Sequence, residues 1–200
     1  MKIYNLNPNN PEKEIIDEAI EVLAQGGVVL YPTDTVYGLG ANIFNKKAVK
    51  KVYKIKNRDF ENPLSILVQN PENIDIIANL SGKTKEYLND YLPGPFTFIL
   101  NKKKVVPSYI TNKKETVGVR VPDSNIARNL AELFPITTTS ANLSNEKTLS
   151  SPEDILNQLN TEVDLVLDIG KLESNIPSRI IDLTSSIPKL LKREWSFFKY

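Results

Sequence analysis

Arginine is the rarer of the two strongly basic residue types in this sequence, and its few positions are therefore informative. Of 25 basic residues only five are arginine, namely Arg58, Arg120, Arg128, Arg179 and Arg193. The planar guanidinium can hold a carboxylate or phosphate with two hydrogen bonds, whereas lysine serves equally well as a solvated surface charge. We therefore treat each arginine as a candidate anion ligand, except Arg128, which falls on a predicted helix and is expected to lie on the surface.

Two segments combine basic or hydroxyl side chains with glycine. In YPTDTVYGLG, residues 31–40, a buried strand gives way to Thr33, Asp34 and Thr35, and loops after strands are where α/β folds place ligands. The alternative is a structural turn in which Asp34 caps local N–H groups. In ETVGVRVPD, residues 115–123, strand alternation places Thr116, Gly118 and Arg120 on one face. A strand arginine on such a face predicts a polar cavity wall that binds an anion.

Two further segments could bind phosphate. Lys56 and Arg58 stand just past a predicted helix, and their side chains can converge on a polyphosphate if the backbone there is extended. The alternative is a solvated helix C-terminus, where basic residues are favoured anyway. In PITTTSANLS, residues 135–144, apolar strand residues lead into hydroxyls and then Asn142. Such a loop either donates hydrogen bonds to phosphate or carboxylate oxygens or caps a helix.

Composition excludes several classes of chemistry. The sequence has no cysteine and no histidine, which removes disulfides, zinc–thiolate sites, thiol nucleophiles and Ser-His-Asp triads. Neither GxxxxGK[ST] nor GxGxxG occurs. Because the net charge is only +1, anion binding must be local. Without a signal-peptide pattern or a long apolar run, we expect a soluble, cytoplasmic protein that makes no membrane contact.

Hydrophobic periodicity predicts the elements that must position these residues. We expect helices over 11–25, 45–56, 72–91 (broken near 81–82) and 124–134, and one beginning at Pro152. We expect strands over 2–6, 28–31, 65–68, 96–100, 117–121, 136–139, 163–168, 179–183 and 189–192. Helices and strands mix without strict alternation, so the predicted fold class is α/β or α+β around a mixed sheet, in a single domain over 1–200.

Taken in order, five segments resemble the YrdC/Sua5 family, the threonylcarbamoyl-AMP synthases. They are YPTDTVYGLG, the Lys-x-Arg with Asn-Pro-Leu, the Pro-Gly-Pro-Phe-Thr turn, Val-Arg-Val-Pro and Ser-Ala-Asn-Leu-Ser, and the likeness runs from Val28 to Arg193. The resemblance implies a short single-domain form: a twisted mixed parallel/antiparallel sheet with flanking helices enclosing a deep basic cavity. It also implies an ATP-dependent nucleotidyltransferase. L-threonine is carboxylated with bicarbonate or CO2, the carbamate attacks the α-phosphorus of ATP, and pyrophosphate leaves.

The resemblance also implies roles for individual residues. L-threonine would be bound by Thr33, Arg120, Ser140 and Ser178, and the ATP phosphates by the catalytic pair Lys56 and Arg58. The nucleotide would also contact Thr116, Asn142 and Arg193. Mg2+ would be bound by the phosphates with few protein ligands, and no protein metal site is expected. Two departures are Leu67, near where longer members carry a histidine, and Trp195, where the family often has glycine after its final arginine.

The product would pass to the machinery that modifies an adenosine, position 37, next to the tRNA anticodon. The main alternative is an RNA-binding module that binds double-stranded RNA or tRNA without catalysing a reaction. The low net charge argues against it. Two lysine clusters could still form a local patch, namely Lys46, Lys47, Lys50 and Lys51, and Lys102, Lys103 and Lys104. A second alternative is a domain like that of hydrogenase maturation factors, whose zinc sites this chain has no Cys or His to build.

Overall fold

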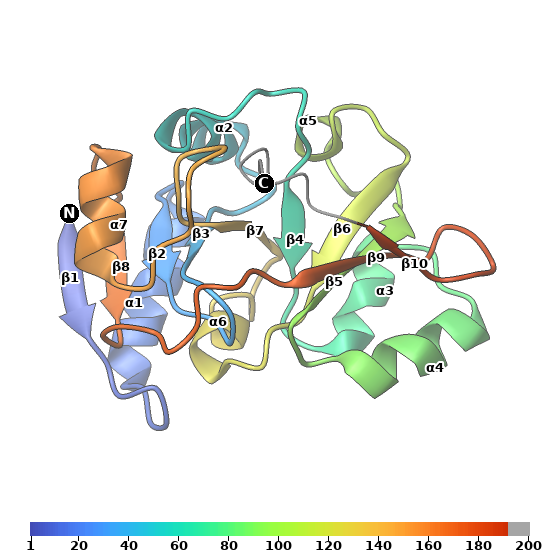
Figure 1. Ribbon diagram of the computed structural model, residues 1–200, viewed down its shortest axis with the longest axis horizontal. Helices are drawn as coiled ribbons and strands as arrows, with labels where there is room; N and C mark the ends of the chain where they lie inside the picture. Colours follow the sequence, from blue (N-terminus) through green and yellow to red (C-terminus); the bar gives the residue numbers. More distant parts are fainter. Residues whose placement is uncertain (192–200) are drawn as a thin grey trace, which may run out of the picture.

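The computed structural model describes residues 1–191 and contains one mixed ten-stranded sheet. The strand order is β1-β8-β2-β3-β7-β4-β6-β5-β9-β10 (Figure 1). The strands are β1 (Lys2–Asn5), β2 (Val29–Tyr31), β3 (Gly38–Gly40), β4 (Ser65–Leu67), β5 (Phe96–Asn101), β6 (Thr116–Arg120), β7 (Ile136–Ser140), β8 (Leu165–Asp168), β9 (Arg179–Asp182) and β10 (Lys189–Leu191). The pairs β1–β8, β2–β8, β4–β6 and β5–β9 are parallel and the others antiparallel. The predicted mixed sheet is confirmed.

Helices cover the two faces of the sheet unequally. They are α1 (Lys13–Ala24), α2 (Lys46–Ile55), a 3-10 turn η1 (Pro71–Asn73), α3 (Ile74–Ile77), α4 (Gly82–Tyr91), α5 (Ser108–Thr111), α6 (Asn125–Asn129) and α7 (Pro152–Leu159). One hydrophobic cluster takes buried residues from α2, α3, α4, α5 and α7. The other takes them from α1 and α6, which pack on β2, β8, β7 and the end of β4. Strands β5, β6 and β9 contribute no buried residue to the second cluster, so their part of that face stays open to form the site.

Local capping explains why several helices begin where the sequence predicts. The side chain of Asn45 accepts hydrogen bonds from the N–H groups of Lys47 and Ala48 at the start of α2. Ser81 and Ser151 cap α4 and α7 in the same way. Two predicted boundaries are wrong: α1 begins at Lys13 rather than at residue 11, and the helix predicted over 124–134 ends at Asn129.

Strand β3 and the short helix α5 are not predicted from the sequence. β3 contains two glycines, which propensity places outside strands. The structure gives the reason for both glycines: a Cβ at Gly38 or Gly40 would lie 2.9 Å from the aromatic ring of Tyr31 on the neighbouring strand. The longest helix, α1, has 12 residues, and no helix in the range 1–191 combines the length and apolarity needed to cross a bilayer.

Candidate functional site

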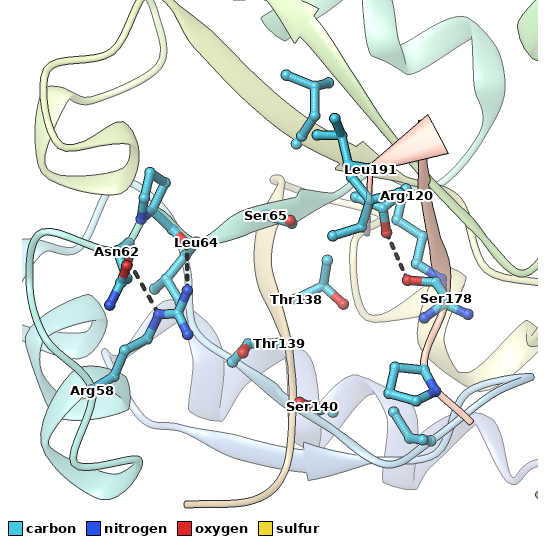
Figure 2. A pocket seen from close by; sticks show the side chains of 18 of the residues that line it. Arg58, Asn62, Leu64, Ser65, Arg120, Thr138, Thr139, Ser140, Ser178 and Leu191 are labelled. Carbon is cyan, nitrogen blue, oxygen red and sulfur yellow. Dashed lines mark hydrogen bonds between the residues drawn. The ribbon is translucent and has the colours of Figure 1, made fainter. Parts of the chain in front are cut away.

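A cavity of about 680 Å³ lies on the open part of the sheet face, over strands β3, β7, β4, β6, β5 and β9. Hydroxyl groups form much of its surface. Figure 2 shows Ser65, Thr138, Thr139 and Ser140 between Arg58 on one side and Arg120 with Ser178 on the other. The cavity therefore presents two guanidinium groups separated by a row of small polar side chains, which suits two anionic groups bound side by side.

Six of the nine predicted site residues line this cavity. They are Thr33, Arg58, Thr116, Arg120, Ser140 and Ser178. Lys56 and Asn142 are buried next to the cavity without lining it. Arg193, like Trp195, lies outside the described residues. Segments separated by more than a hundred residues thus meet at one site, as the motifs taken together predict.

Arg58 reaches the cavity because the chain turns sharply after α2. Asn57 adopts a left-handed conformation with φ +47°. This conformation ends the helix and makes the side chains of Lys56 and Arg58 point in different directions. The expectation that Lys56 and Arg58 converge from an extended backbone is therefore wrong. The guanidinium donates to the carbonyls of Asn62 (3.2 Å) and Pro63 (2.9 Å), and burial lowers the pKa of Arg58.

Arg120 is held at the other side of the cavity by Asp34. One Nη atom of Arg120 lies 2.5 Å from Asp34 Oδ1, and the two side chains are only 5% and 13% exposed. Burial lowers the pKa of Arg120, and the Asp34 charge opposes that shift. Arg120 Nε and Asp34 Oδ2 are buried and have no hydrogen-bond partner among residues 1–191. Asp34 therefore compensates a buried cation that also lines the cavity.

Strand register builds the floor and wall between the two arginines. Ser65 lies beside Gly118 on the neighbouring strand, and a Cβ at Gly118 would lie 2.5 Å from Ser65 Oγ. The hydroxyls of Thr97 and Ser178 are 2.8 Å apart across the parallel pair β5–β9. Because position 118 carries no side chain, the Ser65 side chain fits beside it on the cavity floor.

Charges in the cavity are mixed. Arg58, Lys114 and Arg120 line it together with Asp182. The deep and basic character implied by the resemblance remains a prediction. In the described part of the chain, no three His, Cys, Asp or Glu side chains gather as a metal site.

Several lining residues were missed from the sequence. Alternation along the predicted strands could have placed Ser65 and Thr138 on the cavity face. Asn62 belongs to the Asn-Pro-Leu motif but was given no role, and Lys114 and Asp182 gave no signal because they stand in a loop and at a strand end.

A family model described as telomere recombination, covering Sua5, YciO and YrdC proteins, matches residues 21–194. A putative threonylcarbamoyl-AMP synthase of Methanocaldococcus jannaschii is 39% identical over 183 residues, which is 92% of this chain and 86% of the relative. The uncharacterized protein YciO of Escherichia coli is 31% identical over 195 residues, covering 96% of this chain and 94% of that protein. Relatives of similar length thus include both a named synthase and a protein without a named activity.

Solved structures confirm the fold. Pyrococcus abyssi Sua5 complexed with L-threonine superposes with a TM-score of 0.89 and 34% identity over 96% of this chain. The match covers 57% of the Sua5 chain, so this chain spans a little more than half of that protein. The E. coli YciO structure superposes with a TM-score of 0.87 and 30% identity, covering 96% of both chains.

Proposed function

This chain belongs to the Sua5/YciO/YrdC family, and we propose that it makes threonylcarbamoyl-AMP and pyrophosphate from ATP, L-threonine and bicarbonate or CO2. One observation carries the proposal: a single cavity brings together Arg58 and Arg120 on opposite sides of a row of hydroxyls (Figure 2). The names of the synthase relatives support this enzyme activity over an RNA-binding module.

In this proposal each side of the cavity takes one substrate. Arg120, with Thr33 and Ser178, holds L-threonine through its carboxylate. Arg58 holds the ATP phosphates, and Thr116 contacts the nucleotide; Arg193 would join it from outside the described residues. The small hydroxyl residues between the two sides leave room for the carbamate and the α-phosphate to meet.

The chemistry then depends on positioning and on stabilisation of charge. A carbamate oxygen forms a bond to the α-phosphorus while the bond to the bridging oxygen breaks, and pyrophosphate leaves with that electron pair. The carbamate carries its own negative charge, so this step needs no histidine base, and holding the two groups in line supplies much of the catalysis. Arg58 would offset charge that develops on the departing phosphates.

Mg2+ would enter with the ATP. We propose that phosphate oxygens and water supply its ligands, since Mg2+ readily keeps several waters when it binds nucleotides. Asp182 is the carboxylate that lines the cavity in the described chain. It accepts hydrogen bonds from the N–H and hydroxyl of Thr184, so it fits at most a supporting ligand.

We extend the proposal to the route of the product. Residues 1–200 would act as one domain in the cytoplasm, and the product would pass to the transferase machinery that modifies adenosine 37 of tRNA. A mixed acyl-phosphate anhydride such as this one hydrolyses readily, so a second enzyme must consume it promptly.

Pyrophosphate release tests the proposal. Wild-type protein should release pyrophosphate from ATP only when L-threonine and bicarbonate are both present. Arg58→Ala should lower kcat/KM by about 100-fold or more, because the phosphates lose a preorganised cation. Arg128→Ala is the matched control, since Arg128 hydrogen-bonds Asn125 and does not line the cavity. Pyrophosphate release without threonine, or equal rates for the two variants, would contradict the proposal.

A further inference from the structure

Lys56 is buried behind the cavity wall and reaches the segment that follows β7. The residue is 2% exposed and does not line the cavity. Its ammonium donates to the carbonyls of Ser140 (2.5 Å) and Asn142 (2.6 Å), and its own carbonyl accepts from the N–H of Ser144 (2.8 Å). A buried ammonium needs such oxygen partners. Both the side chain and the backbone of Lys56 are therefore hydrogen-bonded to residues 140–144.

The amide of Asn142 can face only one way in this arrangement. Its Nδ2 donates to the carbonyls of Leu143 and Glu146, each at 2.8 Å. Its Oδ1 lies 3.3 Å from Lys56 Nζ, and an ammonium can only donate. The two carbonyl acceptors at Nδ2 and the ammonium donor at Oδ1 therefore require the same orientation of the amide.

This orientation determines the polarity of Ser140. Ser140 Oγ donates its hydrogen to Asn142 Oδ1 at 2.6 Å. A serine hydroxyl has one hydrogen and two lone pairs, so with that hydrogen used, Ser140 offers acceptor lone pairs to the cavity it lines. Phosphate and carboxylate oxygens also accept and would find no donor there, whereas a substrate N–H would be well matched.

We propose that Lys56 and Asn142 are positioning residues that fix Ser140 as the acceptor for the N–H of the amino-acid substrate. The inference rests on the proposed function, because it takes L-threonine as the ligand. The same acceptor then holds the N–H that remains on the carbamate after carboxylation. The role differs from the direct contacts that the resemblance implies, which are with the ATP phosphates for Lys56 and with the nucleotide for Asn142.

Threonine binding in the absence of ATP separates the two roles. Lys56→Met keeps the length of the side chain and removes the ammonium that holds the carbonyls of Ser140 and Asn142, so residues 140–144 and the Ser140 hydroxyl lose their fixed position. We expect the Kd for L-threonine, measured by calorimetry, to rise about tenfold, as for the loss of one hydrogen bond to a charged group. The Kd for ATP should change less than about twofold. Lys54→Met is the control, because Lys54 is exposed in the last turn of α2, the helix that ends just before Lys56.

Hydrogen exchange of the ligand-free protein gives a second readout. In Lys56→Met the amides of residues 140–146 should exchange faster than in wild type, while those in Lys54→Met should not. The opposite pattern would overturn the inference: ATP binding weakened about tenfold, with threonine affinity and exchange unchanged, would make Lys56 a direct phosphate ligand.

Ser140→Ala keeps the test decisive even if Lys56→Met does not fold, because it removes only a partly exposed hydroxyl. By NMR titration, Ser140→Ala should bind L-threonine about tenfold more weakly and 3-hydroxybutyrate, which lacks the amine, as wild type does. Equal losses for both ligands would overturn the inference. If wild type binds L-threonine and the variants bind it as tightly as wild type does, the inference about Ser140, Lys56 and Asn142 fails. If wild type binds no L-threonine, the proposed function fails.

Discussion

At the scale of single residues, the Arg120–Asp34 pair makes a sharp stability prediction. Asp34→Asn would leave Arg120, with a side chain 5% exposed, without its countercharge. Breaking one side of a buried pair costs about 3–5 kcal/mol, and we expect the free energy of unfolding in urea to fall by about that amount. The KM for L-threonine should rise as well, since the guanidinium loses its support.

A matched control separates this effect from the loss of any surface carboxylate. Asp123 is exposed, and Asp123→Asn should change the free energy of unfolding by less than about 0.5 kcal/mol. If Asp34→Asn proved equally mild, Arg120 would have to be stabilised by something other than Asp34.

Residue chemistry alone pointed to a few of the residues that line the cavity, and the family resemblance supplied the others. The scarcity of arginine drew attention to Arg58 and Arg120, which line the cavity, but equally to Arg179, which is exposed and does not line it. Residue type did not reveal that Arg58 lines the cavity whereas Lys56 lies behind its wall. That difference in side-chain direction depends on the left-handed backbone at Asn57. Asn is enriched in this conformation without being confined to it, so the sequence Lys-Asn-Arg could not decide the direction of either side chain.

At the scale of secondary-structure elements, the parallel register of β4 and β6 requires a glycine at position 118. Gly118→Ala would bring a Cβ to 2.5 Å from Ser65 Oγ and 3.2 Å from Ser65 Cβ. Rotation of the hydroxyl relieves the first contact but not the second. We expect a loss of about 1–3 kcal/mol in the free energy of unfolding, typical of overpacking.

Combining this change with Ser65→Gly should restore part of the loss. The coupling in a double-mutant cycle should exceed about 0.5 kcal/mol, as expected for residues in contact. Ser144→Gly is the control for losing a serine side chain, since Ser144 lies in the loop after β7 and not beside Gly118. Simple additivity between positions 65 and 118 would show that the added methyl is accommodated elsewhere.

At the scale of the whole molecule, the cavity exists because one face of the sheet is only partly covered by helices. Periodicity predicted most strands, and alternation correctly placed Thr116, Gly118 and Arg120 on one face. It could not predict that α1 and α6 stop short of β5, β6 and β9. That outcome depends on pairings such as β5 with β9, whose residues are about 80 positions apart and carry no local signal.

Asp164 joins distant parts of the fold and should make part of its stability depend on pH. Its carboxylate accepts from the N–H of Val28 (2.7 Å) before β2 and from Lys51 Nζ (2.6 Å) on α2. Burial alone would raise the pKa of Asp164, but the bonds from Lys51 and Val28 and the Lys51 charge outweigh it, so the pKa is lowered.

A lowered pKa in the folded state means that this stabilisation is fully present above the unfolded pKa of about 4 and is lost as the pH falls through the lower folded value. Because the Asp164 side chain is 37% exposed, solvent screening limits the effect to about 1 kcal/mol or less. Urea unfolding of Asp164→Asn should therefore show a deficit at pH 7 that shrinks below pH 4, whereas Asp123→Asn should show none. A deficit that stayed constant across this range would mean that Asp164 acts through hydrogen bonds that asparagine cannot replace rather than through its charge.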